Sequence, residues 1–176
     1  MKLIAEAIGR ELKWVQPSAW KMEYELRADD ELIATLRFRS SWGTFATAES
    51  ADGCWTFKRI GFWQTKATIR ACGSDTELAL FKNNTWSGGG TLEFADGRKL
   101  LASTNGWRTT FEFKSETGET LVRFKSGGFV HLSATVEIQP DSAGMTELPW
   151  IVMLGWYLTV MMYLDTATTG SVAAVS

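Results

Sequence analysis

Residues 147–165 read ELPWIVMLGWYLTVMMYLD, and no charged side chain lies between Leu148 and Leu164. A helix that is apolar on all sides is either buried by its own protein or placed across a membrane. Pro149 suits the first turn of such a helix, where its missing N–H is not needed. We therefore predict a helix near residues 147–164, with a length of about 25 Å and a diameter of about 10 Å.

The flanks of this run favour a buried helix over a membrane span. A span needs about 20 apolar residues, and this run is slightly shorter. Asp141, Glu147 and Asp165 are acidic, and no Lys or Arg follows the run to anchor it at a membrane surface. We therefore interpret the run as a core helix and keep a tail-anchored membrane protein as an alternative.

The chain before the helix alternates between apolar and polar residues with a period of two. Residues 20–27, WKMEYELR, place Trp20, Met22, Tyr24 and Leu26 on one face and charged residues on the other. Such alternation predicts strands with one apolar and one solvated face. Short polar turns separate the runs, so consecutive strands must pair as antiparallel hairpins. We predict strands near residues 12–16, 20–28, 32–39, 44–50, 53–59, 66–72, 77–82, 91–95, 98–103, 108–115, 119–125 and 130–138.

This up-and-down order predicts a closed barrel, because closure removes the exposed sheet edges. About eight strands make a barrel that its own side chains fill, whereas about twelve leave a space. The inward residues are apolar, so the helix is a better filling than water. The predicted fold is all-β with one helix: a closed antiparallel barrel of about 12 strands enclosing a C-terminal hydrophobic α-helix. Residues 1–165 form a single domain, and residues 166–176, TATTGSVAAVS, form a flexible tail.

This order of elements resembles the Tubby C-terminal-like superfamily. The resemblance covers about residues 11–165 and rests on twelve predicted antiparallel strands followed by the apolar helix LPWIVMLGWYLTVMMYL. The superfamily includes the Tubby domain, the phospholipid scramblases and the LURP-one-related proteins, and the last group looks most similar because this chain is short and has one domain. The resemblance implies a barrel wrapped around the helix. In Tubby it would also imply phosphoinositide binding by surface lysines and arginines, but no motif carries those residues to positions in this chain.

Antiparallel strands place alternate turns at opposite ends of a barrel, and here the two sets of turns differ in composition. The turns of one end, called the acidic end, contain Asp or Glu and span 28–31, 49–53, 73–77, 95–97, 115–119 and 139–142. The turns of the other end, called the aromatic end, lack both residues and span 39–43, 59–66, 82–90, 103–108 and 125–129. The aromatic and basic side chains predicted to form a binding rim at the aromatic end are Trp42, Trp63, Trp86, Trp107, Arg59, Lys66, Lys82, Arg108 and Lys125.

We predict that this rim binds a membrane surface, an anionic phospholipid or a protein partner. Tryptophan is favoured at membrane interfaces, and each nearby cation adds about 1 kcal/mol of attraction to an anionic leaflet. The alternative is structural: the indoles fold inward and cap the barrel around the end of the helix. Under the first interpretation the protein is a non-enzymatic module that is peripheral to a membrane.

Composition and the N-terminal residues bound the remaining possibilities. The formal net charge is −2 and 22% of the residues are charged, so we predict no nucleic-acid partner. Charged residues interrupt the apolar run that a signal peptide needs in residues 1–14, MKLIAEAIGRELKW. We therefore predict a cytoplasmic monomer in which Cys54 and Cys72 are reduced thiols.

The sequence predicts no catalytic site, metal site or cofactor. His131 is the only histidine, and alternation places it on the polar face of its strand, so zinc lacks a set of ligands. No G-x-S-x-G motif occurs, and no Ser or Cys has an identifiable His partner. We therefore predict that the protein is not an enzyme. An enzyme or small-ligand carrier with a site in the barrel mouth is the alternative, since distant strands can assemble such a site.

Overall fold

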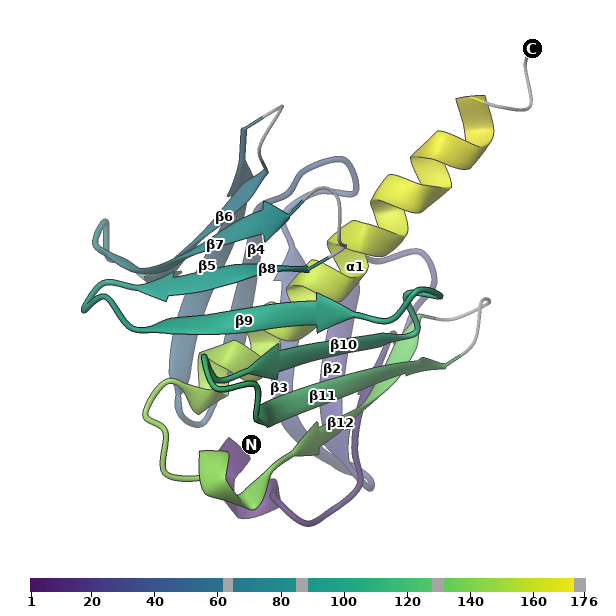
Figure 1. Ribbon diagram of the computed structural model, residues 1–176. Helices are drawn as coiled ribbons and strands as arrows, with labels where there is room; N and C mark the ends of the chain where they lie inside the picture. The colour runs from purple at the N-terminus through teal and green to yellow at the C-terminus, as the bar shows by residue number, and fades with distance from the viewer. Residues whose placement is uncertain (62–64, 85–88, 128–131, 173–176) are drawn as a thin grey trace.

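The computed structural model describes residues 1–61, 65–84, 89–127 and 132–172. These residues form a barrel of twelve strands with one long helix running through it (Figure 1). The strands are β1 (Leu12–Val15), β2 (Glu23–Ala28), β3 (Glu31–Phe38), β4 (Ala46–Ser50), β5 (Gly53–Ile60), β6 (Lys66–Ala71), β7 (Glu77–Asn84), β8 (Gly89–Phe94), β9 (Lys99–Thr104), β10 (Thr110–Lys114), β11 (Thr120–Gly127) and β12 (Ser133–Ile138). The helices are the 3-10 turns η1 (Ile4–Ala7) and η2 (Pro140–Ser142) and the α-helix α1 (Leu148–Val172).

Pairing between the first strand and the last closes the barrel. Each strand pairs antiparallel with its neighbours in the chain, and β1 pairs with both β2 and β12. Trp14 of β1 therefore lies opposite Leu26 on one side and Ala134 on the other. This arrangement confirms the predicted closed antiparallel barrel.

Alternation divides the strand side chains between the lumen and the outer wall. In β10, Phe111 and Phe113 are buried, while the intervening Glu112 contacts cations of the outer wall. The predicted strand boundaries agree with the structure to within three residues. One difference affects the functional site. Trp20 was predicted to lie on the inner face of a strand, but β2 begins only at Glu23, and Trp20 lies exposed in the preceding turn.

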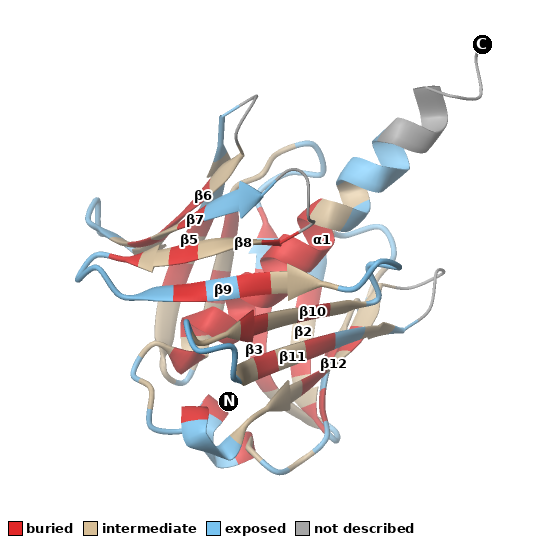
Figure 2. Ribbon diagram, viewed as in Figure 1, coloured by how far each residue is buried: buried red, intermediate tan, exposed pale blue. Residues whose placement is uncertain are grey.

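Helix α1 fills the lumen, which confirms the prediction of a core helix. Residues 150–161 are all buried (Figure 2). The aromatic rings of the helix stack on the wall: Trp156 lies parallel to Trp14 with ring centroids 5.8 Å apart, and Tyr157 stacks on Phe38 at 5.6 Å. Ring pairs at such separations contribute about 0.5–1.5 kcal/mol each beyond the burial of their area.

The same helix passes a test for membrane spans that uses length and composition alone. Its segment Leu148–Thr168 is long and apolar enough to cross a bilayer. However, 67% of the most apolar window is buried inside the barrel. Burial on all sides by strands explains the absence of a polar face, so the apolar run needs no lipid to account for it.

Helix α1 is longer than predicted. It ends at Val172 and not near Leu164, so residues 166–172 of the predicted flexible tail are helical. From Met162 onward the helix leaves the barrel at the aromatic end and projects beyond the strands (Figures 1 and 2). The prediction failed because small polar residues have modest helix propensity, whereas an established helix adds further residues at little cost.

Gly155 marks a close contact between the helix and the barrel wall. A Cβ atom at this position would overlap the ring of Phe124, which is fully buried on β11. Phe124 itself packs against Phe111, with ring centroids 6.1 Å apart, so it has little room to move. A glycine inside a helix costs about 1 kcal/mol of helix propensity. The close approach of Phe124 to the helix backbone explains the presence of glycine here.

Replacement of Gly155 by Leu should lower the free energy of unfolding by about 1–3 kcal/mol, because the added side chain overpacks a filled core. Chemical denaturation monitored by tryptophan fluorescence would measure the change. Gly144→Leu is the matched control, since a Cβ at Gly144 meets no atom within 4 Å. Equal stability of the Gly155 variant and the wild type would contradict the contact with Phe124.

The acidic end of the barrel is covered by the segments that flank the strands. In η1, Ile4 and Ala7 are buried, and the backbone N–H of Ile4 donates to Asp52 Oδ2 in the β4–β5 turn at 3.0 Å. After β12, the buried hydroxyl of Ser142 donates to the carbonyl of Leu121 at 2.9 Å. The two ends therefore differ in structure as well as in charge: the acidic end is covered by flanking segments, whereas the helix projects from the aromatic end.

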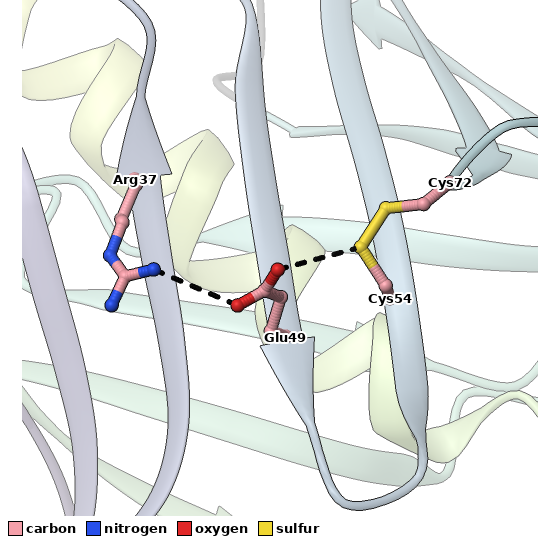
Figure 3. The surroundings of a disulfide bond; sticks show 4 residues. All are labelled: Arg37, Glu49, Cys54 and Cys72. Carbon is pink, nitrogen blue, oxygen red and sulfur yellow. Dashed lines mark hydrogen bonds and ion pairs between the residues drawn. A yellow bond between two sulfur atoms is a disulfide. The ribbon is translucent and has the colours of Figure 1, made fainter.

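The structure pairs Cys54 and Cys72 in a disulfide, so the predicted reduced thiols are wrong (Figure 3). The two Cα atoms are 5.4 Å apart, and the backbone N–H of Cys72 donates to the carbonyl of Cys54. The bond joins the start of β5 to the first residue after β6, near the acidic end. Glu49 Oε1 lies 4.0 Å from Cys54 Sγ, and Arg37 pairs with Glu49 at 3.6 Å. The predicted hairpin of strands 53–59 and 66–72 already placed the two cysteines near each other, and the disulfide was missed because a cytoplasmic location implied reduced thiols.

Candidate functional site

Three turns at the aromatic end each present an almost fully exposed tryptophan. Trp20 in the β1–β2 turn is 94% exposed, Trp42 in the β3–β4 turn is 98% exposed, and Trp107 in the β9–β10 turn is 88% exposed. The other described tryptophans are buried in the core: Trp14, Trp55, Trp150 and Trp156. The alternative in which the rim indoles fold inward is therefore wrong for Trp42 and Trp107.

The remaining two tryptophans of the predicted rim, Trp63 and Trp86, lie outside the described residues. Trp20 was missed as a rim residue, because the alternation of residues 20–27 continues through it and assigned it to a strand. Pro17 and Ser18, three and two residues before it, were the available signals for a turn. Since β1 runs from the acidic end to the aromatic end, the β1–β2 turn belongs to the aromatic end.

The β1–β2 turn is held by its own hydrogen bonds. The side-chain amide of Gln16 donates to the carbonyl of Lys21 at 2.9 Å, and the N–H of Lys21 donates to the carbonyl of Ser18 at 3.2 Å. These bonds fix the backbone on both sides of Trp20. The indole is therefore displayed by an ordered turn.

The β3–β4 turn is tied directly to the core helix. Arg39 N–H donates to the carbonyl of Phe45 at 2.9 Å, which closes the turn around Trp42. The phenol of Tyr157 on α1 donates to the carbonyl of Thr44 at 2.6 Å. Burial raises the pKa of Tyr157, so its hydroxyl stays protonated and remains a donor. The position of this turn therefore depends on the helix inside the barrel.

The β9–β10 turn is organised by a single asparagine. Asn105 Oδ1 accepts from the N–H groups of Thr109 and Thr110 at 2.8 and 3.1 Å, and its amide donates to Thr109 Oγ1 at 2.8 Å. Arg108 has a φ of 55°, a left-handed conformation that is uncommon for a residue with a side chain. The Asn105 bonds stabilise this backbone, which carries Trp107 and Arg108 outward as neighbours.

Most cations of the predicted rim are engaged with carboxylates. The ion pairs are Arg59–Asp165 at 2.9 Å, Lys82–Glu93 at 2.8 Å and Lys125–Glu137 at 2.7 Å. Lys66 lies opposite Lys82 in the β6–β7 ladder. The Lys82 ammonium holds the pKa of Glu93 below its usual value. The structure therefore places these cations on the outer wall and at the helix exit, where their charge is partly balanced.

Arg108 differs from these cations, because its side chain makes no hydrogen bond or ion pair with any residue that the structure describes. Two further exposed cations share this property: Lys21 beside Trp20, and Arg39 in the turn of Trp42. Each of the three exposed indoles therefore has an uncompensated cation in its own turn. The turns 16–22, 39–45 and 105–109 contain no Asp or Glu.

A groove of about 470 Å³ lies between the emerging helix and the β9–β10 turn. Its lining residues are Trp107, Arg108, Thr109, Ser126, Leu132, Thr159, Met162, Tyr163, Thr166 and Ala167. A second cavity, beside Tyr157 and Met161 in the barrel mouth, has a volume of only about 30 Å³, which is the space of one water molecule. The filled lumen thus leaves little room for a substrate inside the barrel.

Comparison with known proteins gave no match: no family profile, no curated protein and no solved structure is significantly similar to this chain. The resemblance to the Tubby C-terminal-like superfamily therefore stays a prediction. No group of three or more His, Cys, Asp or Glu side chains suited to a metal ion occurs in the described ranges, which do not include His131. The geometry of the aromatic end is accordingly the basis for a functional proposal.

Proposed function

We propose that the protein docks on anionic membrane surfaces with the aromatic end of its barrel. The observation that carries this proposal is the exposure of Trp20, Trp42 and Trp107, each at the tip of an ordered turn and all at the same end. Large side chains exposed together on one surface are typical of sites that bind another surface. An indole combines an apolar body with an N–H group and therefore suits the boundary between lipid and water.

Charge supports an anionic membrane over a neutral one. Lys21, Arg39 and Arg108 lie in the same turns as the indoles, and the aromatic end lacks acidic residues in its turns. Juxtamembrane cations contribute about 1 kcal/mol each next to an anionic leaflet. The acidic turns lie at the opposite end of the barrel, so docking by the aromatic end keeps them away from lipid phosphates.

Reversal of the charges of Lys21, Arg39 and Arg108 should abolish binding to anionic vesicles. We expect the triple variant Lys21→Glu, Arg39→Glu and Arg108→Glu to bind at least about 100-fold more weakly in co-sedimentation with vesicles of phosphatidylcholine and phosphatidylserine. The matched control reverses three cations near the acidic end, Lys2, Lys99 and Lys114, and produces the same change in net charge. This control should bind vesicles like the wild type.

The indoles are tested separately in the same assay. Replacement of Trp42 and Trp107 by Ala should weaken binding to anionic vesicles at least about tenfold, because the variant loses interfacial anchors. The melting temperature of the variant should equal that of the wild type, since both side chains contact mainly solvent. Failure of the wild type to bind either neutral or anionic vesicles would refute the proposal. Equal losses in the two charge variants would point to net charge alone and would also refute docking by this end.

A further inference from the structure

The groove beside the emerging helix is not needed for the proposed docking on a membrane surface, which uses only the exposed tryptophans and cations. Thr159, Met162, Tyr163 and Thr166 follow the spacing i, i+3, i+4 and i+7 and therefore form one face of α1. The β9–β10 turn, Ser126 of β11 and Leu132, which precedes β12, complete the groove. Its volume of about 470 Å³ is within the range of small-molecule sites.

We propose that this groove holds one acyl chain of an anionic amphiphile from the bilayer, with the head group at Arg108. The source of the amphiphile rests on the proposed docking at membranes, whereas the chemistry of the site rests on its lining. A chain of methylene groups suits a long apolar groove with one cation at its edge. The occupied groove would leave the lumen and the helix as they are.

The helix side of the groove is apolar despite its two threonines, Thr159 and Thr166, whereas Thr109 and Ser126 line the other side. The hydroxyl of Thr159 donates to the carbonyl of Gly155 at 2.8 Å, and the hydroxyl of Thr166 donates to the carbonyl of Tyr163, also at 2.8 Å. Both hydroxyl groups form hydrogen bonds within the helix, so the two threonines present mainly their methyl groups to a ligand. Met162 is half-buried and Tyr163 is 43% exposed, so this apolar face has no cover among the described residues.

The head-group position follows from charge. Arg108 is the only charged residue among those that line the groove, and it makes no ion pair in the described part of the chain. Guanidinium groups bind phosphate and carboxylate oxygens through paired hydrogen bonds. The Asn105 hydrogen bonds hold the Arg108 backbone in place before a ligand arrives, which reduces the ordering that binding requires.

Binding can be measured without a membrane by titrating the full chain with dodecyl phosphate below its critical micelle concentration, using calorimetry. We expect saturable binding, a loss of at least about tenfold for dodecanol, and no binding of inorganic phosphate. Each CH₂ removed from the chain should weaken binding about three- to fourfold, as expected for methylene burial. Chain-length independence, or binding of inorganic phosphate alone, would overturn the proposal.

Two helix variants test the location. Thr166→Phe fills the groove and should reduce dodecyl phosphate binding at least about tenfold, whereas Thr168→Phe adds the same bulk on the opposite helix face and should not. Arg108→Gln should bring dodecyl phosphate down to the affinity of dodecanol. Equal binding by the Thr166 and Thr168 variants would refute the site. If Thr166→Phe loses dodecyl phosphate binding but still binds vesicles, the docking proposal stands. If the wild type binds dodecyl phosphate but not vesicles, only the docking proposal is refuted.

Discussion

A chain truncated after Asp141 will not fold. The missing residues include α1, whose segment 150–161 is buried on all sides by the strands. Without the helix, the inner rings of the barrel would face an unfilled space, and Trp14 and Phe38 would lose their stacking partners Trp156 and Tyr157. Loss of a single large core side chain costs about 3–5 kcal/mol, and total domain stability is about 5–15 kcal/mol. Deletion of an entire core helix therefore exceeds what the fold can tolerate.

Circular dichroism and thermal melting of the truncated chain would measure this effect. A chain that ends at Thr168 is the control, because it keeps every helix residue described as buried and should melt cooperatively like the full protein. A cooperative melt of the short chain would show that the barrel is stable without α1. That result would support the tail-anchor alternative, in which the helix belongs to a membrane and not to the core.

Replacement of Cys54 and Cys72 by Ser should lower the free energy of unfolding by about 3 kcal/mol. The disulfide closes a loop with a sequence separation of 18 residues, and the chain-entropy argument assigns about 3 kcal/mol to a loop near this length. Reduction of the wild-type disulfide should lower the denaturant midpoint to that of the double variant. The double variant is the control and should not respond to reductant. Two titratable thiols in protein purified without reductant would contradict the disulfide.

The disulfide also bears on where the protein works. Disulfides persist in oxidising compartments and are rare in the cytosol. The cytoplasmic location inferred from residues 1–14 stays a prediction, and the Cys54–Cys72 bond weighs against it.

The architecture could be predicted because its two periodicities are strong and local. Period-two alternation marks the strands, and the uncharged run 148–164 marks the helix, so the barrel follows from closing the sheet around it. Gly155 was also predictable as a close contact, because glycine is costly inside a helix. These features depend on residues that are near one another in the chain.

The missed features depend on contacts between distant residues or on weak local signals. The disulfide was missed because the predicted cytoplasmic location implied reduced thiols, although the predicted hairpin of residues 53–59 and 66–72 brings Cys54 and Cys72 together. The pairing of Lys82 and Lys125 with carboxylates on neighbouring strands was invisible, so the predicted rim included cations that are already engaged. Trp20 was misplaced because alternation alone does not show where a strand begins.

The position of α1 in the chain imposes an order on biosynthesis. The helix follows all twelve strands, so each strand leaves the ribosome before the element that fills the barrel has been made. The β1–β12 seam joins the two ends of the strand series, and closing it early would shut the helix out of the lumen. Strands that pair before α1 has been made would form an open sheet with its apolar inner side chains toward solvent, the kind of species that aggregates and that chaperones protect. In a barrel whose core helix is made last, the apolar inner side chains are thus exposed until the final step of folding.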